Sequence, residues 1–293
     1  IAMLDEFRMI VITGGEPLLR SDIFELMEHA GKLGFHIIFS TNGTLLTPDI
    51  ARDLAKLGVA NFSISLDGFT PECHESIRRV SGCFQSAIDG IRAAAQTGVC
   101  LQVNFTAMKQ NLSELPGIID LTESLKADIL MVFQAIQPRQ ANGELELDAE
   151  EQMHLIRTIA EKQKKARALI MPVCCPEYWP WLVEHRRFAF GKNIQRKAFS
   201  GCGAGTGFSY IRFDGDVWAC NFISLSAGNV RRTAFIDIWN NSPLLREFRR
   251  RPGQLKGACG DCAHQGICGG CRGRAFAHTT DPFAADPACL INH

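Results

Sequence analysis

Apolar runs recur along the first half of the chain, and stretches with helix-like spacing of apolar residues lie between them. All but the last run are rich in Val, Ile, Leu and Phe without alternation, which is typical of strands covered on both faces. The predicted strands cover residues 7–13, 35–40, 60–66, 100–106 and 129–134. The predicted helices cover residues 20–32, 47–57, 84–97 and 112–125. One strand–helix unit takes about 27 to 34 residues, which predicts a parallel sheet or a (β/α) barrel.

Capping signals mark the predicted helix boundaries. Thr47 is the expected N-cap of the second helix, and Pro48 occupies its first position. Gly34 and Gly58 are expected where helices end, because glycine adopts the left-handed conformation of a helix C-terminus without strain.

The second half of the chain has a different composition. A further, highly charged helix is expected over residues 148–167, and from about Phe199 onward Gly, Cys and Arg dominate, with short elements only. We therefore expect a partial barrel at residues 1–145, a bridging helical region at 146–198 and a cysteine-rich domain at 199–293.

Charge and cysteine content narrow the class of protein. The net charge is zero, so charge gives no indication of binding to nucleic acid or to an anionic membrane. No apolar run approaches the roughly 20 residues of a membrane span. Twelve cysteines are many for 293 residues, and seven of them fall in the last third. Because they occur in close pairs and no export signal is seen, metal or cluster ligation in a reducing cytoplasm is a better interpretation than disulfides.

Polar residues collect where the predicted strands end. The first strand runs into Thr13-Gly14-Gly15-Glu16-Pro17, the second into Ser40-Thr41-Asn42-Gly43, and the third into Ser63-Ile64-Ser65-Leu66-Asp67-Gly68. In a barrel the carboxyl ends of the strands meet at one rim, so these residues predict a site for a polar ligand. Asn-Gly and Asp-Gly are also common turn formers, and that interpretation stays open for each pair taken alone.

These three strand ends together resemble the radical S-adenosylmethionine (SAM) superfamily. In that family the Gly-Gly-Glu-Pro segment receives the methionine amino group of the cofactor, which assigns Gly14, Gly15 and Glu16 to SAM binding. The resemblance also implies ribose and carboxylate contacts from Ser40, Asn42 and Ser65. Arg78 matches a basic position of the family, although a solvated charge on a helix explains it equally well.

The family's Cys-x3-Cys-x2-Cys motif, which binds the radical-generating [4Fe–4S] cluster, has no counterpart here, because the first cysteine is Cys73. We expect that this cluster loop and the first barrel strand lie outside the present sequence; a degenerate relative is the alternative. The implied fold is α/β, a partial (β/α)6 TIM-like barrel followed by a small cysteine-rich domain.

The cysteines of the last third resemble the SPASM extension of radical SAM enzymes, which binds auxiliary iron–sulfur clusters. The resemblance assigns one cluster to Cys259, Cys262, Cys268 and Cys289, and a second, if present, to Cys202, Cys220 and Cys271. The second set has only three thiolates, so its fourth iron is open to substrate or bound by another side chain. A zinc ribbon is disfavoured because only five residues separate the two Cys-x2-Cys pairs. The adjacent Cys174 and Cys175 are interpreted as structural, since neighbouring side chains point apart in extended backbone.

The resemblance also implies a reaction. A reduced [4Fe–4S] cluster cleaves SAM to a 5′-deoxyadenosyl radical, which takes a hydrogen atom from substrate, while one or two auxiliary [4Fe–4S] clusters transfer electrons or bind substrate. The motifs around Cys202, Cys220 and Cys271 look most like the group that modifies siroheme-derived tetrapyrroles toward heme b or heme d1. The carboxylates of such a substrate would pair with arginines, for which Arg78, Arg139, Arg272 and Arg274 are candidates.

Other function classes remain possible. A SPASM maturase that modifies a ribosomally made peptide is one alternative, and a non-catalytic iron–sulfur electron-transfer protein is another. The expected partners are the tetrapyrrole or peptide substrate and a reductant such as flavodoxin or ferredoxin, with no nucleic acid and no membrane. A cytoplasmic location is expected.

Overall fold

Six strands form one sheet in which neighbours in the sheet are also neighbours along the chain. In this computed structural model, which describes residues 8–137, 144–185 and 201–290, the strand pairs from β1 to β4 are parallel. The strands are β1 (Met9–Ile12), β2 (His36–Thr41), β3 (Val59–Ser65), β4 (Cys100–Ala107), β5 (Ile129–Gln134) and β6 (Leu169–Val173). This order is that of repeated βα units, as the spacing of apolar runs predicts.

Helices connect these strands. They are α1 (Ile23–Lys32), α2 (Pro48–Lys56), α3 (Pro71–Arg78), α4 (Cys83–Ala95), α5 (Leu115–Ser124) and α6 (Ala149–Lys162), with 3₁₀ turns η1 (Pro17–Leu19) and η2 (Leu112–Glu114). Thr47 caps α2 by accepting a hydrogen bond from the Ile50 amide, and Pro48 follows it, as predicted. Gly34 and Gly58 have φ of 79° and 87°, so both helix exits are confirmed.

Two elements were missed by the pattern of the sequence. The short helix α3 begins after its N-cap Thr70 and is too brief to show a clear helical period. The strand β6 directly follows the charged stretch, where the predicted helix was extended to residue 167 although α6 ends at Lys162. Both lie beside polar residues that obscure the apolar pattern.

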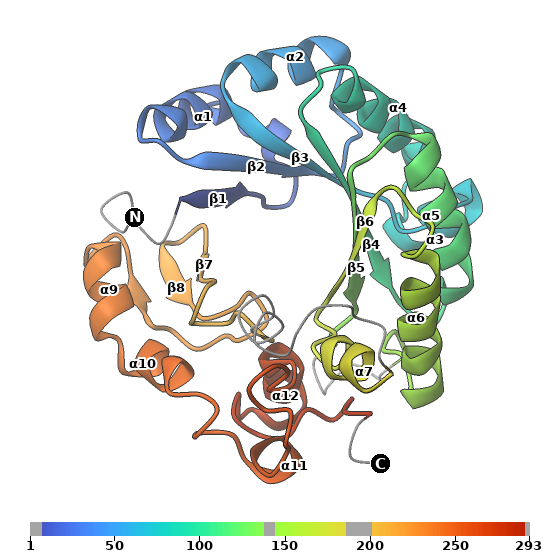
Figure 1. Ribbon diagram of the computed structural model, residues 1–293. Helices are drawn as coiled ribbons and strands as arrows, with labels where there is room; N and C mark the ends of the chain where they lie inside the picture. Colours follow the sequence, from blue (N-terminus) through green and yellow to red (C-terminus); the bar gives the residue numbers. More distant parts are fainter. Residues whose placement is uncertain (1–7, 138–143, 186–200, 291–293) are drawn as a thin grey trace. The chain divides into compact units, whose positions relative to one another are not determined.

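The two faces of the sheet differ in chemistry. Ile37 and Phe39 of β2 and Val103 of β4 are fully buried on one face, which α1, α2, α4 and α5 cover (Figure 1). Each such side chain contributes roughly 1.5–3 kcal/mol of stability. The opposite face carries buried Ser63 and Gln102. The prediction that the strands are covered on both faces is thus confirmed for β3 and β4, but the predicted lack of alternation is wrong, because alternate positions there are polar.

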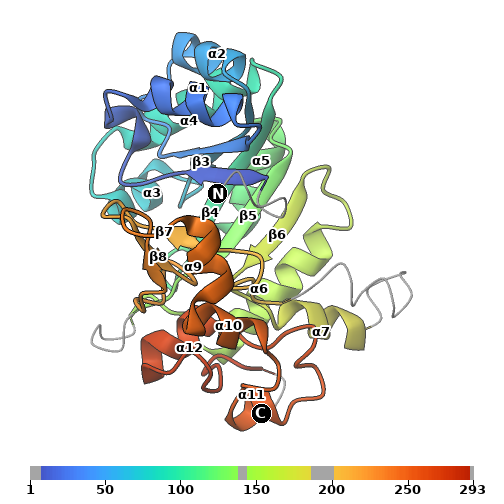
Figure 2. The ribbon, with the colours of Figure 1, turned by 90° about the vertical axis from the view of Figure 1, so that its left-hand side faces the viewer.

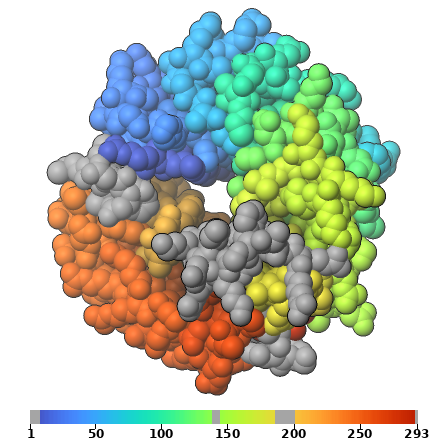
Figure 3. All heavy atoms as spheres, viewed as in Figure 1, coloured from blue at the N-terminus to red at the C-terminus, as the bar shows by residue number. Residues whose placement is uncertain are grey.

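The edge strand β1 is more exposed than its neighbours. Met9 and Val11 are 61% and 45% exposed, and the atoms of β1 are visible in the space-filling view (dark blue in Figure 3). Among the described residues, this leaves the start of the Gly-Gly-Glu-Pro segment at an accessible edge of the sheet.

The chain divides into two compact units. One comprises Ala2–Phe133 and Glu161–Met171 and is called the barrel unit; the other comprises Gln134–Ala160 and Pro172–His293 and is called the cysteine-rich unit. The predicted division at residues 145 and 198 concerns sequence domains and stays a prediction. No helix within the described residues has the length and apolarity that a membrane crossing requires.

The cysteine-rich unit includes most of α6, and its remaining elements are short, as the composition from residue 199 onward predicts. β7 (Tyr210–Ile211), β8 (Asp216–Trp218) and β9 (Gly228–Asn229) form a small antiparallel sheet. The helices are α7 (Tyr178–Glu184), α9 (Phe235–Asn241), α10 (Pro243–Arg249), α11 (Gly257–Gly260) and α12 (Arg272–Thr279). Figures 1 and 2 show α9 beside the small sheet.

Candidate functional site

Glu16 ties the ends of the first two strands together. Its carboxylate accepts hydrogen bonds from the Leu18 amide (3.2 Å), the Thr41 hydroxyl (2.7 Å) and the Asn42 amide (2.8 Å). A carboxylate offers about four acceptor positions, so these contacts leave about one for a ligand. The carboxylate is thus held in a fixed position at the rim of the sheet.

Gly14 and Gly15 leave open space at the same rim. A β-carbon built at either position would meet no atom within 4 Å, and both residues are exposed. Neither needs the left-handed backbone conformation, so strain does not explain why both are glycine. The absence of side chains allows a ligand to approach the main-chain carbonyls here, which fits the predicted contact with the SAM amino group.

The Asn42-Gly43 pair forms a tight turn and also contributes to the rim. The Asn42 side-chain oxygen accepts from the Thr44 amide (2.8 Å) and hydroxyl (2.7 Å), an Asx turn. Gly43 has φ of 82°, and a side chain there would collide with Ile64. Asn42 therefore forms the turn and is also the predicted site residue, so the two interpretations do not exclude each other.

Ser40 and Ser65 lie on the polar face of the sheet. Ser40 is in register with Ser63, and Ser65 is in register with Asn104. The side-chain amide of Asn104 donates a hydrogen bond to the Ser63 hydroxyl at 2.6 Å. The side-chain amide of Gln102 donates to both Ser63 and Asn104, which completes a small polar network. Both predicted residues are half-buried, next to this ordered polar network.

Arg78 forms an ion pair with Asp67 at the end of β3. The distance is 2.7 Å, and the Asp67 carboxylate also accepts from the Thr106 amide at 2.9 Å. The Asp67 amide in turn donates to Nδ1 of His74. Burial, together with the nearby Arg78 charge, lowers the pKa of His74. Arg78 therefore helps to fix the β3 end, and its contact with SAM stays a prediction.

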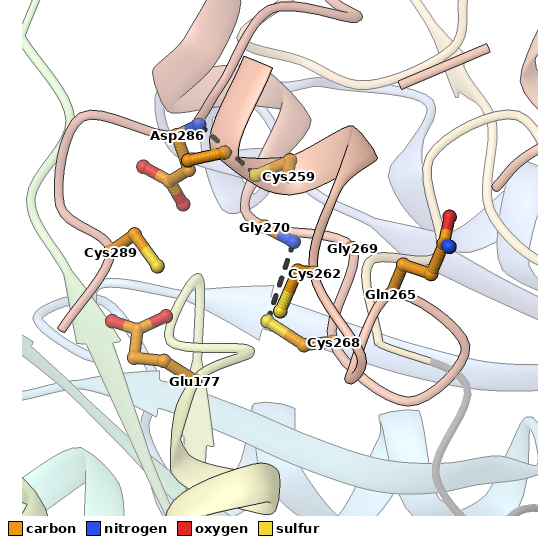
Figure 4. A pocket seen from close by; sticks show the side chains of 10 residues that line it. Glu177, Cys259, Cys262, Gln265, Cys268, Gly269, Gly270, Asp286 and Cys289 are labelled. Atoms are coloured by element: carbon orange, nitrogen blue, oxygen red, sulfur yellow. Dashed lines mark hydrogen bonds between the residues drawn. The ribbon is translucent and has the colours of Figure 1, made fainter. Parts of the chain in front are cut away.

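Four predicted cluster ligands line one pocket of the cysteine-rich unit. Figure 4 shows Cys259, Cys262, Cys268 and Cys289 around this pocket, with Glu177 and Asp286 among its other lining residues. Cys259 lies on α11, whereas the other three lie on loops. None of the twelve cysteines is paired in a disulfide. The structure thus brings together the cysteine set that the SPASM resemblance assigns to the first auxiliary cluster.

Backbone amides point at three of these sulfurs. The donor–sulfur distances are 3.3 Å from Asp286 to Cys259, 3.4 Å from His264 to Cys262 and 3.4 Å from Gly270 to Cys268. Such bonds stabilise thiolate ligands and tune the potential of an iron–sulfur cluster.

Gly270 makes the close packing at this pocket possible. A β-carbon there would stand 3.0 Å from the Cys259 sulfur and 2.7 Å from the Asp286 β-carbon. Its φ of 60° also favours glycine. Both the space and the amides therefore suit a set of thiolate ligands.

The geometry of the pocket differs from that of a site for a single metal ion. Among the described residues, no three His, Cys, Asp or Glu side chains meet closely enough to hold one metal ion. In an iron–sulfur cluster each iron takes its own thiolate, so the ligands need not converge on one point. The four thiols around the pocket are the donor type that such a cluster requires.

Arg272 and Arg274 are both buried and bound within the protein. Arg272 donates to the carbonyls of Pro282 (3.1 Å) and Ala284 (2.6 Å) and lies 3.5 Å from the Cys259 sulfur. Arg274 pairs with Asp286 at 3.3 Å and also bonds Gln134. The prediction that either arginine pairs with substrate carboxylates is wrong, because their donors are used inside the fold. Arg139 lies outside the described residues.

Glu177 was not found by sequence reasoning. It is buried beside the four thiols, and burial raises its pKa to about 7. Within the described residues its Oε1 atom has no hydrogen-bond partner. A glutamate next to an aromatic, proline-containing segment gives no sign of burial in the sequence, so this position depends on tertiary packing.

The cysteines predicted to bind the second cluster, Cys202, Cys220 and Cys271, also interact with one another. The Cys271 amide donates to Asp286 at 2.6 Å, and the Cys202 carbonyl accepts from Arg251 at 2.9 Å. Burial raises the pKa of Cys220 to about 12, and nearby Cys202 and Cys271 add to this effect. A hydrogen bond from the Cys174 thiol lowers the pKa of Cys271 to about 7.

Comparison with known families agrees with both resemblances. Residues 2–122 match the radical SAM superfamily, and residues 202–263 match the SPASM iron–sulfur cluster-binding domain. The AdoMet-dependent heme synthase of Methanosarcina barkeri is 32% identical over 288 residues, which cover 96% of this chain and 82% of that protein. The chain belongs to the radical SAM superfamily. This radical SAM protein therefore uses SAM and [4Fe–4S] clusters, and it is an enzyme, as predicted.

Other relatives and solved structures are also similar to this radical SAM protein. Pre-heme d1 synthase of Dinoroseobacter shibae is 31% identical over 96% of the chain and 75% of its own length. Mycofactocin maturase MftC of Mycobacterium tuberculosis is 30% identical over 96% of the chain and 70% of its own length. Streptococcus suis SuiB bound to S-adenosylmethionine aligns with a TM-score of 0.73 at 20% identity, over 96% of this chain and 65% of SuiB. The predicted α/β fold is thereby confirmed.

Proposed function

We propose that this protein generates a 5′-deoxyadenosyl radical to decarboxylate, or remove side chains from, a siroheme-derived tetrapyrrole on the way to heme b or heme d1. One observation carries the proposal. Three proteins named AdoMet-dependent heme synthase are 32–33% identical to the chain and match 96–98% of it. The identity to pre-heme d1 synthase, at 31%, supports the same substrate class.

The rim of the barrel unit would bind and orient SAM. The open main chain at Gly14 and Gly15 receives the ammonium group, and the Glu16 carboxylate, fixed by Thr41 and Asn42, adds its negative charge. Ser40 and Ser65 on the polar face, with Asn42, would contact the ribose and the carboxylate. When bound and reduced, the radical-SAM cluster supplies the electron that cleaves SAM; its family motif has no counterpart in residues 1–293.

The cysteine-rich unit would hold the auxiliary clusters. Cys259, Cys262, Cys268 and Cys289 bind the first, and Cys202, Cys220 and Cys271 contribute to the second. These clusters would accept or donate electrons during the reaction of the substrate. A ferredoxin or flavodoxin would deliver electrons to the protein. Amide hydrogen bonds to the thiolates, together with burial, would set the reduction potential of the first auxiliary cluster.

Peptide modification is the second candidate. Mycofactocin maturase MftC is nearly as similar in sequence, at 30% identity over 96% of the chain. The folds of SuiB and of anSMEcpe, the latter solved with bound AdoMet and a peptide, also align, although at 20% and 16% identity these alignments speak only for the fold. The fold is thus common to both substrate classes, and the substrate must be tested directly.

The deciding experiment measures SAM cleavage against substrate. The full protein is reconstituted with iron and sulfide, reduced, and incubated with SAM plus either a didecarboxysiroheme-type tetrapyrrole or a peptide pool. We expect 5′-deoxyadenosine and a tetrapyrrole that has lost carboxyl carbon, both measured by mass spectrometry. Stimulation by peptide alone would overturn the tetrapyrrole assignment, and no cleavage under any condition would overturn the catalytic one.

A further inference from the structure

The second auxiliary site lacks one thiolate in the predicted set, and the structure brings another cysteine to it. Cys174 directly follows β6, and its thiol is hydrogen-bonded to that of Cys271. Cys174, Cys202 and Cys220 are half-buried and Cys271 is buried, and the Cys174 sulfur also interacts electrostatically with Cys220. A cysteine from a distant part of the chain therefore lies among the three predicted ligands.

One buried ion pair fixes the backbone on both sides of the Cys174–Cys271 contact. Arg274 donates to the Cys174 carbonyl at 2.7 Å and pairs with Asp286 at 3.3 Å. Asp286 accepts from the Cys271 amide at 2.6 Å. Both Arg274 and Asp286 are almost fully buried, so the two cysteine backbones are held by the same rigid pair.

Cys202 and Cys220 are held near the same place by other contacts. Arg251 donates to the carbonyls of Cys202 (2.9 Å) and Ala204 (2.8 Å), which fixes the loop that carries Cys202. The Gly205 amide donates to the Ala219 carbonyl at 3.1 Å, so this loop lies against the residue before Cys220. The Cys220 sulfur interacts with those of Cys202 and Cys271. Cys220 therefore has Cys174, Cys202 and Cys271 as electrostatic neighbours, and these four cysteines come from four segments of the chain.

We propose that Cys174 is the fourth thiolate ligand of the second auxiliary cluster, beside Cys202, Cys220 and Cys271. The inference rests on the proposed ligand set for that cluster. It replaces the interpretation of Cys174 as structural. It leaves that interpretation for Cys175, whose thiol contacts Glu177 instead. The two adjacent thiols thus have different neighbours, and of the two only Cys174 is hydrogen-bonded to a cysteine of the predicted set.

The backbone at Cys174 supports a requirement for the thiol. Its φ of 60° lies in the left-handed region, where glycine is much more easily accommodated than cysteine. A cysteine at a position suited to glycine implies that its side chain is needed. With four thiolates every iron of the cluster is saturated, so the second cluster would transfer electrons rather than bind substrate directly.

The same strained backbone provides a clean test. Cys174→Gly removes the sulfur and relieves the backbone, so loss of the cluster cannot be attributed to a misfolded turn. Cys175→Ser is the matched negative control, because it changes the neighbouring buried thiol. Cys220→Ala is the positive control, because it removes an already proposed ligand. Each reconstituted full chain is assayed for iron and sulfide, and for the electron paramagnetic resonance signal of a three-iron cluster after mild ferricyanide oxidation.

We expect Cys174→Gly either to lose about four iron atoms per chain relative to wild type or to form a three-iron cluster on oxidation, as three-thiolate sites do. Cys175→Ser should match wild type, and Cys220→Ala should lose iron. Any cluster elsewhere contributes equally to all variants, so the differences between them are the readout.

Two results would overturn the inference, and they differ in meaning. If Cys220→Ala loses iron while Cys174→Gly matches wild type in iron content and in spectrum, Cys174 is not a ligand and the proposed set stands. If Cys220→Ala also keeps all its iron, the second cluster itself is absent and the ligand set fails as well. Neither result bears on SAM cleavage with a tetrapyrrole, which tests the proposed function separately.

Discussion

The two units of this protein are stabilised by different kinds of interaction. In the barrel unit, apolar residues such as Phe39, Phe62 and Phe105 fill the space between the sheet and its helices. The cysteine-rich unit also buries apolar residues such as Leu155, Val217 and Phe248, but its elements after β6 are short, and the largest fully buried side chain of the described residues, Arg272, is charged. Apolar burial stabilises a unit without a ligand, whereas a unit that also buries charges and thiols depends in part on what the thiols bind.

Carboxylates also serve the two units differently. In the barrel unit Glu16 and Asp67 accept from backbone amides and so join the ends of neighbouring strands. In the cysteine-rich unit Asp286 pairs with Arg274 and accepts from the Cys271 amide. The first arrangement shapes a rim for a ligand, and the second holds cysteines in place. The following five predictions test this contrast, from the largest expected effect to the smallest.

Removal of the clusters should separate the two units most clearly. Iron chelation under reducing conditions should destabilise the cysteine-rich unit by on the order of 5–10 kcal/mol, because metal-site binding energy is also folding energy. All four tryptophans belong to this unit, so their fluorescence follows it alone. Limited proteolysis should then cut within residues 201–290 and leave the barrel unit intact. Equal loss of both units would show that the contrast is wrong.

Replacement of the buried arginine should have the next largest effect. Arg272→Met leaves the carbonyls of Pro282, Ala284 and Gly270 without their donor, which should cost about 3 to 5 kcal/mol. Urea unfolding followed by tryptophan fluorescence measures the loss. The exposed Arg232→Met is the matched control and should change stability little. Unchanged stability of Arg272→Met would mean that buried charge does not support this unit.

The close contact between α4 and the Asn42-Gly43 turn should make the stability of the barrel unit sensitive to a small substitution. Gly90 of α4 faces the Gly43 backbone, and a β-carbon there would collide with the Gly43 carbonyl. Gly90→Ala should therefore cost about 2 to 3 kcal/mol in urea unfolding followed by far-ultraviolet circular dichroism. Gly31→Ala in α1, where the nearest atom would stand at 3.3 Å, is the control and should be close to neutral. A neutral Gly90→Ala would show that α4 can move away from the Asn42-Gly43 turn.

Loss of the Glu16 charge should affect binding more than stability. Glu16→Gln keeps one acceptor but weakens charge-assisted bonds, so we expect about 1 to 2 kcal/mol of destabilisation and roughly tenfold weaker SAM binding. Equilibrium dialysis with labelled SAM measures the second effect. Glu25→Gln on the exposed face of α1 is the control. Unchanged SAM affinity would remove Glu16 from the proposed binding site.

The smallest expected effect is a pH dependence confined to the barrel unit. The pKa of His74 is lowered from 6.5 by burial, so above pH 6.5 its neutral ring contributes full stability. As the pH falls below 6.5 toward the lowered folded pKa, the unfolded state binds the proton first and that contribution is lost. His74→Asn, which can still accept from the Asp67 amide, should flatten this decline in unfolding free energy. The exposed His29→Asn should retain the wild-type slope; if His74→Asn retains it too, His74 is not the group responsible.

Much of the fold could be predicted from the sequence because it depends on local patterns. Apolar runs place β1 to β5, and the Thr47-Pro48 cap places the start of α2. The Gly-Gly-Glu-Pro segment follows a strand in the structure as it does in the sequence pattern. The helix α3 and the strand β6 could not be predicted, since neither carries a period long enough to stand out from its polar surroundings.

The candidate site shows the same division. The SPASM resemblance selects the four cysteines that line the pocket. Spacing alone would not have done so, because Cys271 is closer in sequence to Cys268 than Cys289 is, yet only Cys289 lines the pocket. Arginine positions alone gave the wrong role for Arg272 and Arg274, since nothing in a Gly-Cys-Arg-rich stretch shows which arginine is buried. The burial of Glu177 could not be predicted for the same reason.

The sequence by itself determined the βα repeat, the acidic diglycine corner and the cysteine pairs, because each is written in residues that lie near one another along the chain. Only the tertiary structure decided that Glu16 binds Thr41 and Asn42, and that Cys174 meets Cys271. These contacts join segments far apart in sequence, and packing brings such segments together through many small terms that no local pattern contains.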